Sequence, residues 1–294
     1  MVLSYYNLFN VVTGIKIVIH MELNVVYNED CLEGMNRIED KSIDMILCDL
    51  PYGTTACKWD TIIPFEPLWK QYERIITDTG CICLFGSEPF SSYLRISNIK
   101  LYKYDWIWEK GGASGFLHAK NKPLKAHENI SIFSKGTTGH KSQSTKRMYY
   151  EPIMEDGKPY IKKITRVNTG SLYNTSKSNL DFVGSVNVNK GTRYPRSVLK
   201  YSLHNVGLLH PTQKPVELFE YLIKTYTKEG DIVLDNCMGS GTTAIACINT
   251  NRNYIGFEID KEYYDIILER IKNHKPDVKP DVIQESKQGL ETWF

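Results

Sequence analysis

Continuous apolar runs alternate with segments of helical spacing along most of this chain. The runs at residues 43–48 and 81–85 are apolar at nearly every position, as is usual for strands buried on both faces of a sheet. Segments at residues 31–38 and 68–76 instead repeat apolar residues at helical spacing. Strands that alternate with helices predict an α/β fold with a doubly wound, mostly parallel sheet.

The same alternation continues on both sides of a long polar interruption. It fades after residue 135, where Ser, Thr, Asn, Gly and Lys dominate, and it returns at Pro215, near the first turn of a predicted helix. The chain is therefore expected to be one α/β domain with a sizeable insertion. The other expected elements are strands at residues 24–27, 102–108, 129–133, 232–234 and 253–257, and helices at residues 244–248 and 261–271.

This interruption sets the expected organisation of the 294 residues. Residues 21–134 and 206–274 form the two parts of the α/β domain, and residues 135–205 form the insertion between them. Residues 275–294 are expected to be a poorly ordered tail. Residues 1–20 are an N-terminal extension without a basic leader or a small-residue cleavage site, so we expect neither a signal peptide nor a membrane span there.

Charge is unevenly spread along the chain. Residues 135–200 contain thirteen Lys or Arg and four Asp or Glu, which gives this stretch +9 and leaves −7 for the remainder. Tyrosines are interleaved with these basic residues, a pattern that favours phosphate contact and base stacking over a merely disordered polar loop. A Gly- and Lys-rich loop near residues 110–122 is a further candidate, although a surface loop is its plainer interpretation. The candidate nucleic-acid contacts are Lys110, Lys120, Lys122, Arg147, Lys162, Lys163, Arg193 and Arg196.

The seven cysteines form no CxxC pair, and several of them lie in apolar runs. They are expected to be buried free thiols of a reducing compartment, which favours the cytoplasm. No metal site is expected from them, and none of them stands in a nucleophile motif.

The apolar run at residues 43–48 ends in the tetrapeptide Asp49, Leu50, Pro51 and Tyr52. The Asp49 carboxylate and the Leu50 carbonyl are two acceptors, Pro51 fixes the direction of that carbonyl, and Tyr52 offers a flat face. Such a set suits a planar ring with an amino group, such as an adenine or a cytosine turned out of a duplex. An ordinary Pro-containing turn is the alternative for an isolated tetrapeptide.

A second junction joins a strand to a helix through a glycine-containing loop, in which a ligand can approach backbone N–H groups at the helix start. The loop has neither the P-loop ending nor the GxGxxG spacing of dinucleotide sites. Glu258 ends the next strand, some twenty residues beyond the glycines, where an acid can accept hydrogen bonds from ribose hydroxyls. The loop residues of interest are Asp235, Gly239, Ser240, Gly241 and Thr242.

Jointly, these motifs resemble the amino DNA methyltransferases with their motifs in the β order. The resemblance rests on residues 49–52, the sequence His-Pro-Thr-Gln-Lys-Pro at residues 210–215, residues 235–243 and Glu258. In the β order the catalytic tetrapeptide precedes the glycine loop, and the DNA-recognition region lies between them. The likeness covers residues 24–272 or thereabouts, and its motifs are specific together rather than singly.

The resemblance implies a Rossmann-like sheet that binds S-adenosylmethionine, with a catalytic part at residues 21–134, a target-recognition region at 135–205 and a cofactor-binding part at 206–274. It implies that Asp49, Leu50, Pro51 and Tyr52 are the catalytic residues. Those assigned to the cofactor are Asp30 at its adenine, Glu258 at its ribose, Asp235, Gly239, Ser240, Gly241 and Thr242 in the loop, and His210, Thr212 and Lys214 near its methionine end. From the residues alone, Asp30 is equally well explained as a helix cap.

Two positions depart from the pattern of the family that the chain resembles. Asn236 and Cys237 replace the usual Pro-Phe after the loop aspartate, which removes an aromatic ring near the cofactor. Leu50 replaces a proline found in many members, but its carbonyl, Pro51 and Tyr52 are retained.

The resemblance therefore implies a site-specific enzyme that methylates the N6 amino group of a flipped-out adenine in double-stranded DNA. An N4-cytosine enzyme is the main alternative, followed by an RNA or protein-amide methyltransferase and by a non-catalytic DNA-binding protein. A tetrapeptide that begins with Asp favours adenine in this family. A cognate restriction endonuclease is a candidate partner, and the sequence leaves open whether the protein is a monomer or a homodimer.

Overall fold

The computed structural model describes residues 21–54, 60–139, 146–163, 186–202 and 213–275. Its helices are α1 (Cys31–Met35), α2 (Phe65–Ile75), α3 (Phe90–Ser97), α4 (Val216–Tyr226), α5 (Thr242–Asn249) and α6 (Lys261–Asn273), with a short 3-10 helix η1 (Phe116–His118). The strands of the main sheet are β1 (Val25–Tyr27), β2 (Ile43–Cys48), β3 (Ile76–Gly86), β4 (Tyr102–Ser114), β5 (Lys125–Phe133), β10 (Val198–Tyr201), β11 (Ile232–Asp235) and β12 (Asn253–Phe257).

The eight strands lie in the order β1-β12-β11-β2-β3-β5-β4-β10. Every neighbouring pair in this sheet is parallel except the two pairs that β5 forms with β3 and β4. The predicted mostly parallel sheet is confirmed. Because β5 runs against its neighbours, its first residues lie at the edge where the parallel strands end.

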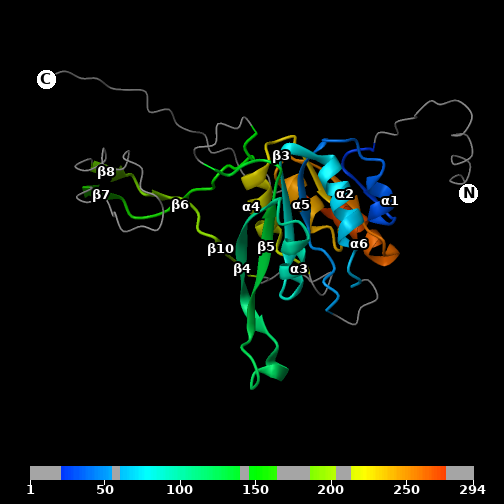
Figure 1. The fold of residues 1–294 in the computed structure, drawn as a ribbon, viewed down its shortest axis with the longest axis horizontal. Coiled ribbons are helices and arrows are strands. Elements are labelled where there is room, and N and C mark those ends of the chain that lie inside the picture. The colour runs from blue at the N-terminus through cyan, green and yellow to red at the C-terminus, as the bar shows by residue number, and fades with distance from the viewer. Residues whose placement is uncertain (1–20, 55–59, 140–145, 164–185, 203–212, 276–294) are drawn as a thin grey trace, which may run out of the picture.

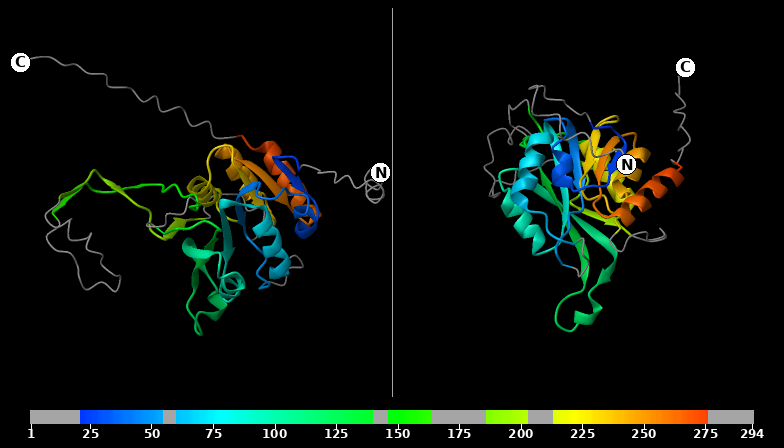
Figure 2. Two further views of the ribbon diagram at one scale, coloured as in Figure 1. Left: turned by 45° about the horizontal axis from the view of Figure 1, so that its top comes forward. Right: turned by 90° about the vertical axis from the view of Figure 1, so that its right-hand side faces the viewer.

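Helices cover both faces of the sheet (Figure 2). Along β2, Ile46 and Cys48 pack with α1 and α2, whereas Met45 and Leu47 belong to the opposite core, which contains residues of α4 and α5. A strand that alternates between two apolar layers needs hydrophobic side chains at every position. This explains the continuous apolar run that predicted a buried strand.

Several expected boundaries were wrong in detail. α2 ends at Ile75 and β3 begins at once, so Ile76 is the first residue of a strand rather than the last of a helix. The helix α3 was not predicted. Lys110, Gly111 and Gly112 lie within β4 and not in a loop, because pairing with β5 extends the strand to Ser114.

The insertion supplies one strand to the main sheet, and its other described strands lie outside that sheet. β10 pairs in parallel with β4, and the Trp108 indole donates a hydrogen bond to the Tyr201 carbonyl at 2.8 Å. The remaining described strands of the insertion form an arm of two short ladders that projects from the body (Figure 1). The arm contains β6 (Glu155–Asp156) paired with β9 (Thr192–Arg193), and β7 (Tyr160–Lys163) paired with β8 (Val186–Asn189).

A second projection is the long hairpin made by β4 and β5, with η1 at its tip (Figure 1). The hairpin extends from the edge where the parallel strands end, since β4 finishes there and β5 begins there. The arm leaves from the opposite edge, where β5 ends and β10 begins. The hairpin therefore starts where the parallel strands end, and the arm starts at the opposite ends of the strands.

Gly34 tests the packing of α1 on the sheet. A Cβ at this position would lie 2.1 Å from a ring carbon of Phe257 in β12, so Gly34→Ala should overpack the core and lower the unfolding free energy by about 1–3 kcal/mol. Urea unfolding checks this, with Gly112→Ala as the control because its Cβ would meet nothing within 4 Å. An increase in stability, as helix propensity alone would give, contradicts the prediction.

Candidate active site

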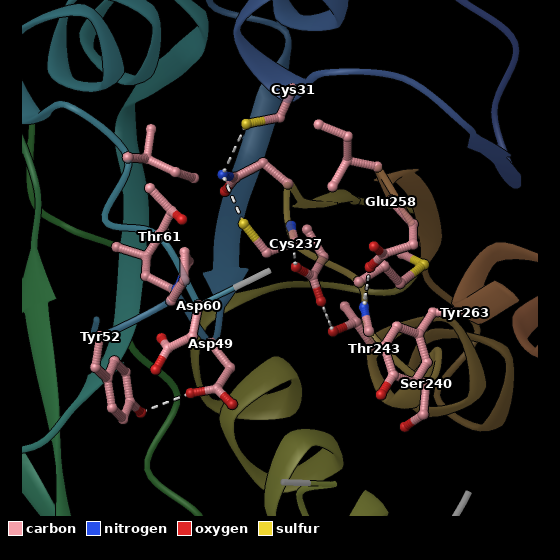
Figure 3. Close-up of a pocket in the computed structure, with 18 of the residues that line it drawn as sticks. Cys31, Asp49, Tyr52, Asp60, Thr61, Cys237, Ser240, Thr243, Glu258 and Tyr263 are labelled. Carbon is pink, nitrogen blue, oxygen red and sulfur yellow. Dashed lines mark hydrogen bonds between the residues drawn. The ribbon is translucent and has the colours of Figure 1, made fainter. Parts of the chain in front are cut away.

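A cavity of about 490 Å³ lies at the edge where the parallel strands end (Figure 3). It is lined by residues that follow β1, β2, β11 and β12, and by Gln213 and Lys214 in front of α4. Open α/β sheets bind their ligands at this edge. The topology thus brings the predicted tetrapeptide, the glycine loop and Glu258 together, although up to some two hundred residues separate them in the chain.

Asp49 and Tyr52 form one end of the cavity. The Tyr52 hydroxyl donates a hydrogen bond to Asp49 Oδ1 at 2.6 Å, and the Tyr52 ring stacks on Phe90 with 5.1 Å between ring centres. Burial, followed by the negative charges of Asp49 and Glu128, raises the pKa of Tyr52 well above its ordinary value. Tyr52 is therefore a hydrogen-bond donor at neutral pH, and it fixes one oxygen of the carboxylate.

Lys214 lies against Asp49 although its side chain is only 6% exposed. Its ammonium group forms ion pairs with Asp49 Oδ2 and, at 3.4 Å, with Glu128 Oε2. Burial lowers the pKa of Lys214, but the two carboxylates outweigh that effect and the pKa is raised overall. Lys214 was assigned to the cofactor, and the structure places it in the same cavity at the Asp49 end.

Glu128 was missed by the sequence analysis. It lies near the start of β5, is 8% exposed, and pairs with Lys110 through Oε1. Burial opposes its ionisation, but the charges of Lys214 and Lys110 prevail and lower the pKa of Glu128. An acid directly before the predicted strand at residues 129–133 was the available signal, but only the reversed direction of β5 brings it to this edge.

The glycine loop is organised by the buried side chain of Asp235. Its carboxylate accepts hydrogen bonds from the Cys237 amide at 3.0 Å and from the Thr243 hydroxyl (Figure 3). Burial raises the pKa of Asp235 to about 6. Gly239 and Gly241 have φ angles of +54° and +80°, which other residues rarely adopt, so the turn that leads into α5 depends on glycine.

Glu258 closes the loop from the neighbouring strand. Its Oε2 accepts a hydrogen bond from the Gly239 amide at 2.7 Å and its Oε1 accepts one from the Asp260 amide at 2.9 Å. Burial raises the pKa of Glu258 to about 7. The two hydrogen bonds lower it, but their effect is smaller than that of burial. Hydrogen bonds therefore fix both oxygens of the carboxylate at the cavity wall, and the pKa of the group lies close to neutral pH.

Asp30 caps α1 and also lines the cavity. Its Oδ1 accepts hydrogen bonds from the amides of Leu32 at 2.7 Å and Glu33 at 3.4 Å, which confirms the helix cap. It also lines the cavity, as do Ser240 and Thr242. The cap and the lining position are compatible because the start of α1 faces the cavity.

Asn236 and Cys237, which replace the usual Pro-Phe of the family, give this part of the cavity wall an amide and a thiol. The Asn236 amide lies 3.6 Å from the Cys31 sulfur and 3.5 Å from the Cys237 sulfur (Figure 3). The six cysteines of the described residues are free, as expected, and burial raises the pKa of Cys48 to about 12. Such thiols stay protonated at neutral pH and are poor nucleophiles.

The remaining candidates are spread over several places. His210 and Thr212 lie outside the described residues. Lys110 pairs with Glu128 at the cavity, whereas Lys120 and Lys122 are exposed near the tip of the β4–β5 hairpin. In the arm and beside it lie Lys162 and Lys163 on β7, Arg193 on β9 with its guanidinium 4.8 Å from the Tyr160 ring centre, the exposed Arg196, and Arg147 in a bridge with Thr137.

Neither a membrane helix nor a metal cluster is found in the part of the chain that the structure describes. No helix there has the length and apolar character needed to cross a bilayer. Within the same ranges, no three His, Cys, Asp or Glu residues are grouped so that they could hold a metal ion.

The sheet order, the reversed β5 and the acidic residues at the ends of β11 and β12 define a Rossmann-like methyltransferase that uses S-adenosylmethionine. The family model described as DNA methylase matches residues 43–269. The chain therefore belongs to the family of site-specific DNA methyltransferases that act on N6 or N4 amino groups.

Individual relatives agree with this assignment. The orphan methyltransferase M.BamHII of Bacillus amyloliquefaciens is 32% identical over 253 residues, which cover 81% of this chain and 92% of that protein. The type II methyltransferase M1.MboII of Moraxella bovis is 27% identical, with 83% of this chain and 94% of that protein covered.

Solved structures support the fold. The crystal structure of the M1.HpyAVI–SAM complex aligns with a TM-score of 0.55 and 24% identity, over 83% of this chain and 98% of that chain. The cytosine-N4-specific PvuII DNA methyltransferase aligns with a TM-score of 0.58 and 17% identity, over 85% of this chain and 87% of that chain.

The raised pKa of Glu258 predicts a pH-dependent stability. The folded protein holds this proton more tightly than the unfolded chain, so the unfolding free energy should fall as pH rises from the ordinary value of 4.5 towards about 7. Glu258→Gln cannot titrate and should remove part of this fall, while Asp235 continues to contribute. Urea unfolding of both proteins at several pH values measures the difference, and identical slopes would contradict the assignment.

Proposed function

We propose that the protein methylates the N6 amino group of adenine within a specific sequence of double-stranded DNA. The observation that carries this proposal is the Asp49 carboxylate in a cavity that is also lined by Asp235 and Glu258. A tetrapeptide that begins with Asp favours adenine, and N4-cytosine is the alternative. Nucleoside analysis of methylated DNA by mass spectrometry distinguishes the two, because the modified bases differ in mass.

The residues of the cavity fit S-adenosylmethionine. A Cβ at Gly239 would meet nothing within 4 Å, so the loop backbone is open to a ligand on that side. Glu258 would accept hydrogen bonds from the ribose hydroxyls, Asp30 would meet the adenine, and the loop with Asp235 would hold the methionine part. His210 and Thr212 are kept as proposed contacts at the methionine end.

The chemistry follows from donors and acceptors. When bound, S-adenosylmethionine would supply an electrophilic methyl group: the base's amino nitrogen would form the new N–C bond, the C–S electron pair would stay on sulfur, and the methylated nitrogen would lose one proton to solvent. The nitrogen's lone pair is conjugated with the ring and is a poor nucleophile. Asp49 and the Leu50 carbonyl would accept its two hydrogens and favour a more pyramidal nitrogen, while Tyr52 would support the ring.

Asp49→Ala should reduce methylation by roughly 10³-fold or more, because the amino group loses its main acceptor. Binding of S-adenosylmethionine, measured by calorimetry, should change little, since Asp49 is at the other end of the cavity from Glu258. Asp49→Asn, which keeps the side-chain volume, separates loss of charge from loss of packing. Methylation at the wild-type rate by either variant would overturn the assignment of Asp49.

DNA contact is proposed for both projections of the fold. The hairpin starts at the same edge as Asp49, so the exposed Lys120 and Lys122 near its tip would contact phosphates of the duplex on that side of the protein. The arm, with Lys162, Lys163 and Arg193, would contact the duplex farther away and contribute to recognition of the sequence. A cognate restriction endonuclease, a cytoplasmic location and a monomeric or homodimeric state are further proposals that accompany this function.

Salt dependence tests the hairpin contact. A plot of log K for DNA binding against log salt has a negative slope, and each lost phosphate contact reduces the magnitude of that slope by about 0.9. The double variant Lys120→Ala/Lys122→Ala should therefore reduce its magnitude by about 2. DNA binding by fluorescence anisotropy at several salt concentrations gives the slope. The control is Lys70→Ala/Lys272→Ala, which removes two exposed lysines from α2 and α6. Equal slopes in the two double variants would exclude the hairpin lysines.

A further inference from the structure

The Asp49 carboxylate already has a donor at each of its oxygens. Tyr52 donates to Oδ1 and Lys214 donates to Oδ2. A target amino group would have to share an oxygen with one of these donors. An acceptor paired with a cation is weakened for any further hydrogen bond, so Lys214 competes with the function proposed for Asp49.

Glu128 faces the same ammonium group from the other side. Its Oε2 lies 3.4 Å from Lys214 Nζ and 3.4 Å from the Tyr52 hydroxyl, so it contacts both of the groups that donate to Asp49. Its Oε1 pairs with Lys110. Lys214 is further enclosed by aromatic rings, with Phe85 at 5.5 Å and Trp108 at 6.0 Å from Nζ to ring centre.

The charges of this cluster have a consequence for the target nitrogen. Asp49, Glu128, Lys214 and Lys110 together carry no net charge, whereas without Glu128 the two lysines and Asp49 would carry one net positive charge. Methyl transfer places positive charge on the amino nitrogen, and a nearby negative group in a water-poor site stabilises that charge. Glu128 offsets the positive charge of the lysines, which would otherwise oppose this step, and it contacts Asp49 only through Lys214 and Tyr52.

We propose that Glu128 is a positioning residue that holds Lys214 and so keeps Asp49 a strong acceptor for the target amino group. This inference rests on the proposed function of Asp49. In this arrangement Glu128 shares the ammonium with Asp49, and Lys110 fixes the far oxygen of Glu128. The lysine thereby locks the direction of the Asp49 carboxylate without neutralising it.

The first test is Glu128→Gln. The amide keeps the shape of the side chain and retains an oxygen for Lys214 and Tyr52, so the change removes charge more than packing. We expect kcat to fall roughly 10- to 100-fold, with KM for DNA and for S-adenosylmethionine within about threefold of wild type. The matched control is Glu109→Gln on β4, which removes the carboxylate of an exposed ion pair with Lys200.

A binding measurement without cofactor separates this role from a structural one. Oligonucleotides that carry at the target position either adenine or purine, which lacks the amino group, report how strongly the amino group is held. Wild type should prefer adenine, and Glu128→Gln should reduce the ratio of the two affinities while Glu109→Gln leaves it unchanged. If mass spectrometry identifies cytosine as the target, cytosine and pyrimidin-2-one are the corresponding pair.

A double-variant cycle tests whether Glu128 acts through Lys214. In a Lys214→Gln background, Glu128→Gln should have no further effect on the affinity ratio, because the competing cation is absent. If Glu128→Gln does not fold, as judged by its melting curve, Glu128→Asp serves instead, and retention of most of the wild-type ratio supports the need for charge.

The outcomes are distinguishable from failure of the proposed function. If Asp49→Ala retains methylation, the role of Asp49 is wrong and this inference falls with it. If Asp49→Ala is inactive but Glu128→Gln matches the Glu109→Gln control, only the inference about Glu128 is wrong. Additive effects of the Glu128 and Lys214 variants likewise overturn it, since they would show that Glu128 acts independently.

Discussion

A buried ammonium group between two carboxylates holds the active site of this protein together. Lys214 comes from the segment before α4, Asp49 from the end of β2 and Glu128 from the start of β5. Removing such charges from water is costly, and only close pairing compensates for it. The pairing therefore constrains where three separate parts of the chain can lie, and it joins the part of the domain before the insertion to the part after it.

The direction of β5 makes this pairing possible. In a fully parallel sheet the first residues of every strand lie at the edge away from the ligand, so an acid at the start of a strand would be remote from Asp49. β5 runs against β3 and β4, which brings Glu128 to the ligand edge and starts the long hairpin there. One reversal thus positions both an acidic group inside the site and lysines outside it.

The two ends of the cavity differ in how their carboxylates are treated. Glu128 pairs with lysines, which favour its charged form. Asp235 and Glu258 are instead held by backbone amides and a hydroxyl, and burial raises the pKa of each. The first arrangement suits a group that must remain charged. The second suits carboxyl groups that accept hydrogen bonds from hydroxyl or amino groups of a ligand. When a ligand displaces the carboxyl proton, the charged group that remains is a stronger acceptor.

By itself, the sequence determined the class of fold and most of its strands. It also identified the tetrapeptide, the glycine loop and Glu258 as candidate site residues at strand ends, because these features depend on local patterns of burial and backbone freedom. It placed Lys214 in the cavity only through the resemblance to a family. Tertiary structure alone decided the partners of Lys214, the position of Glu128 at the cavity and the inclusion of β10 in the sheet. Those features depend on strand direction and on contacts between distant residues, which no local pattern encodes.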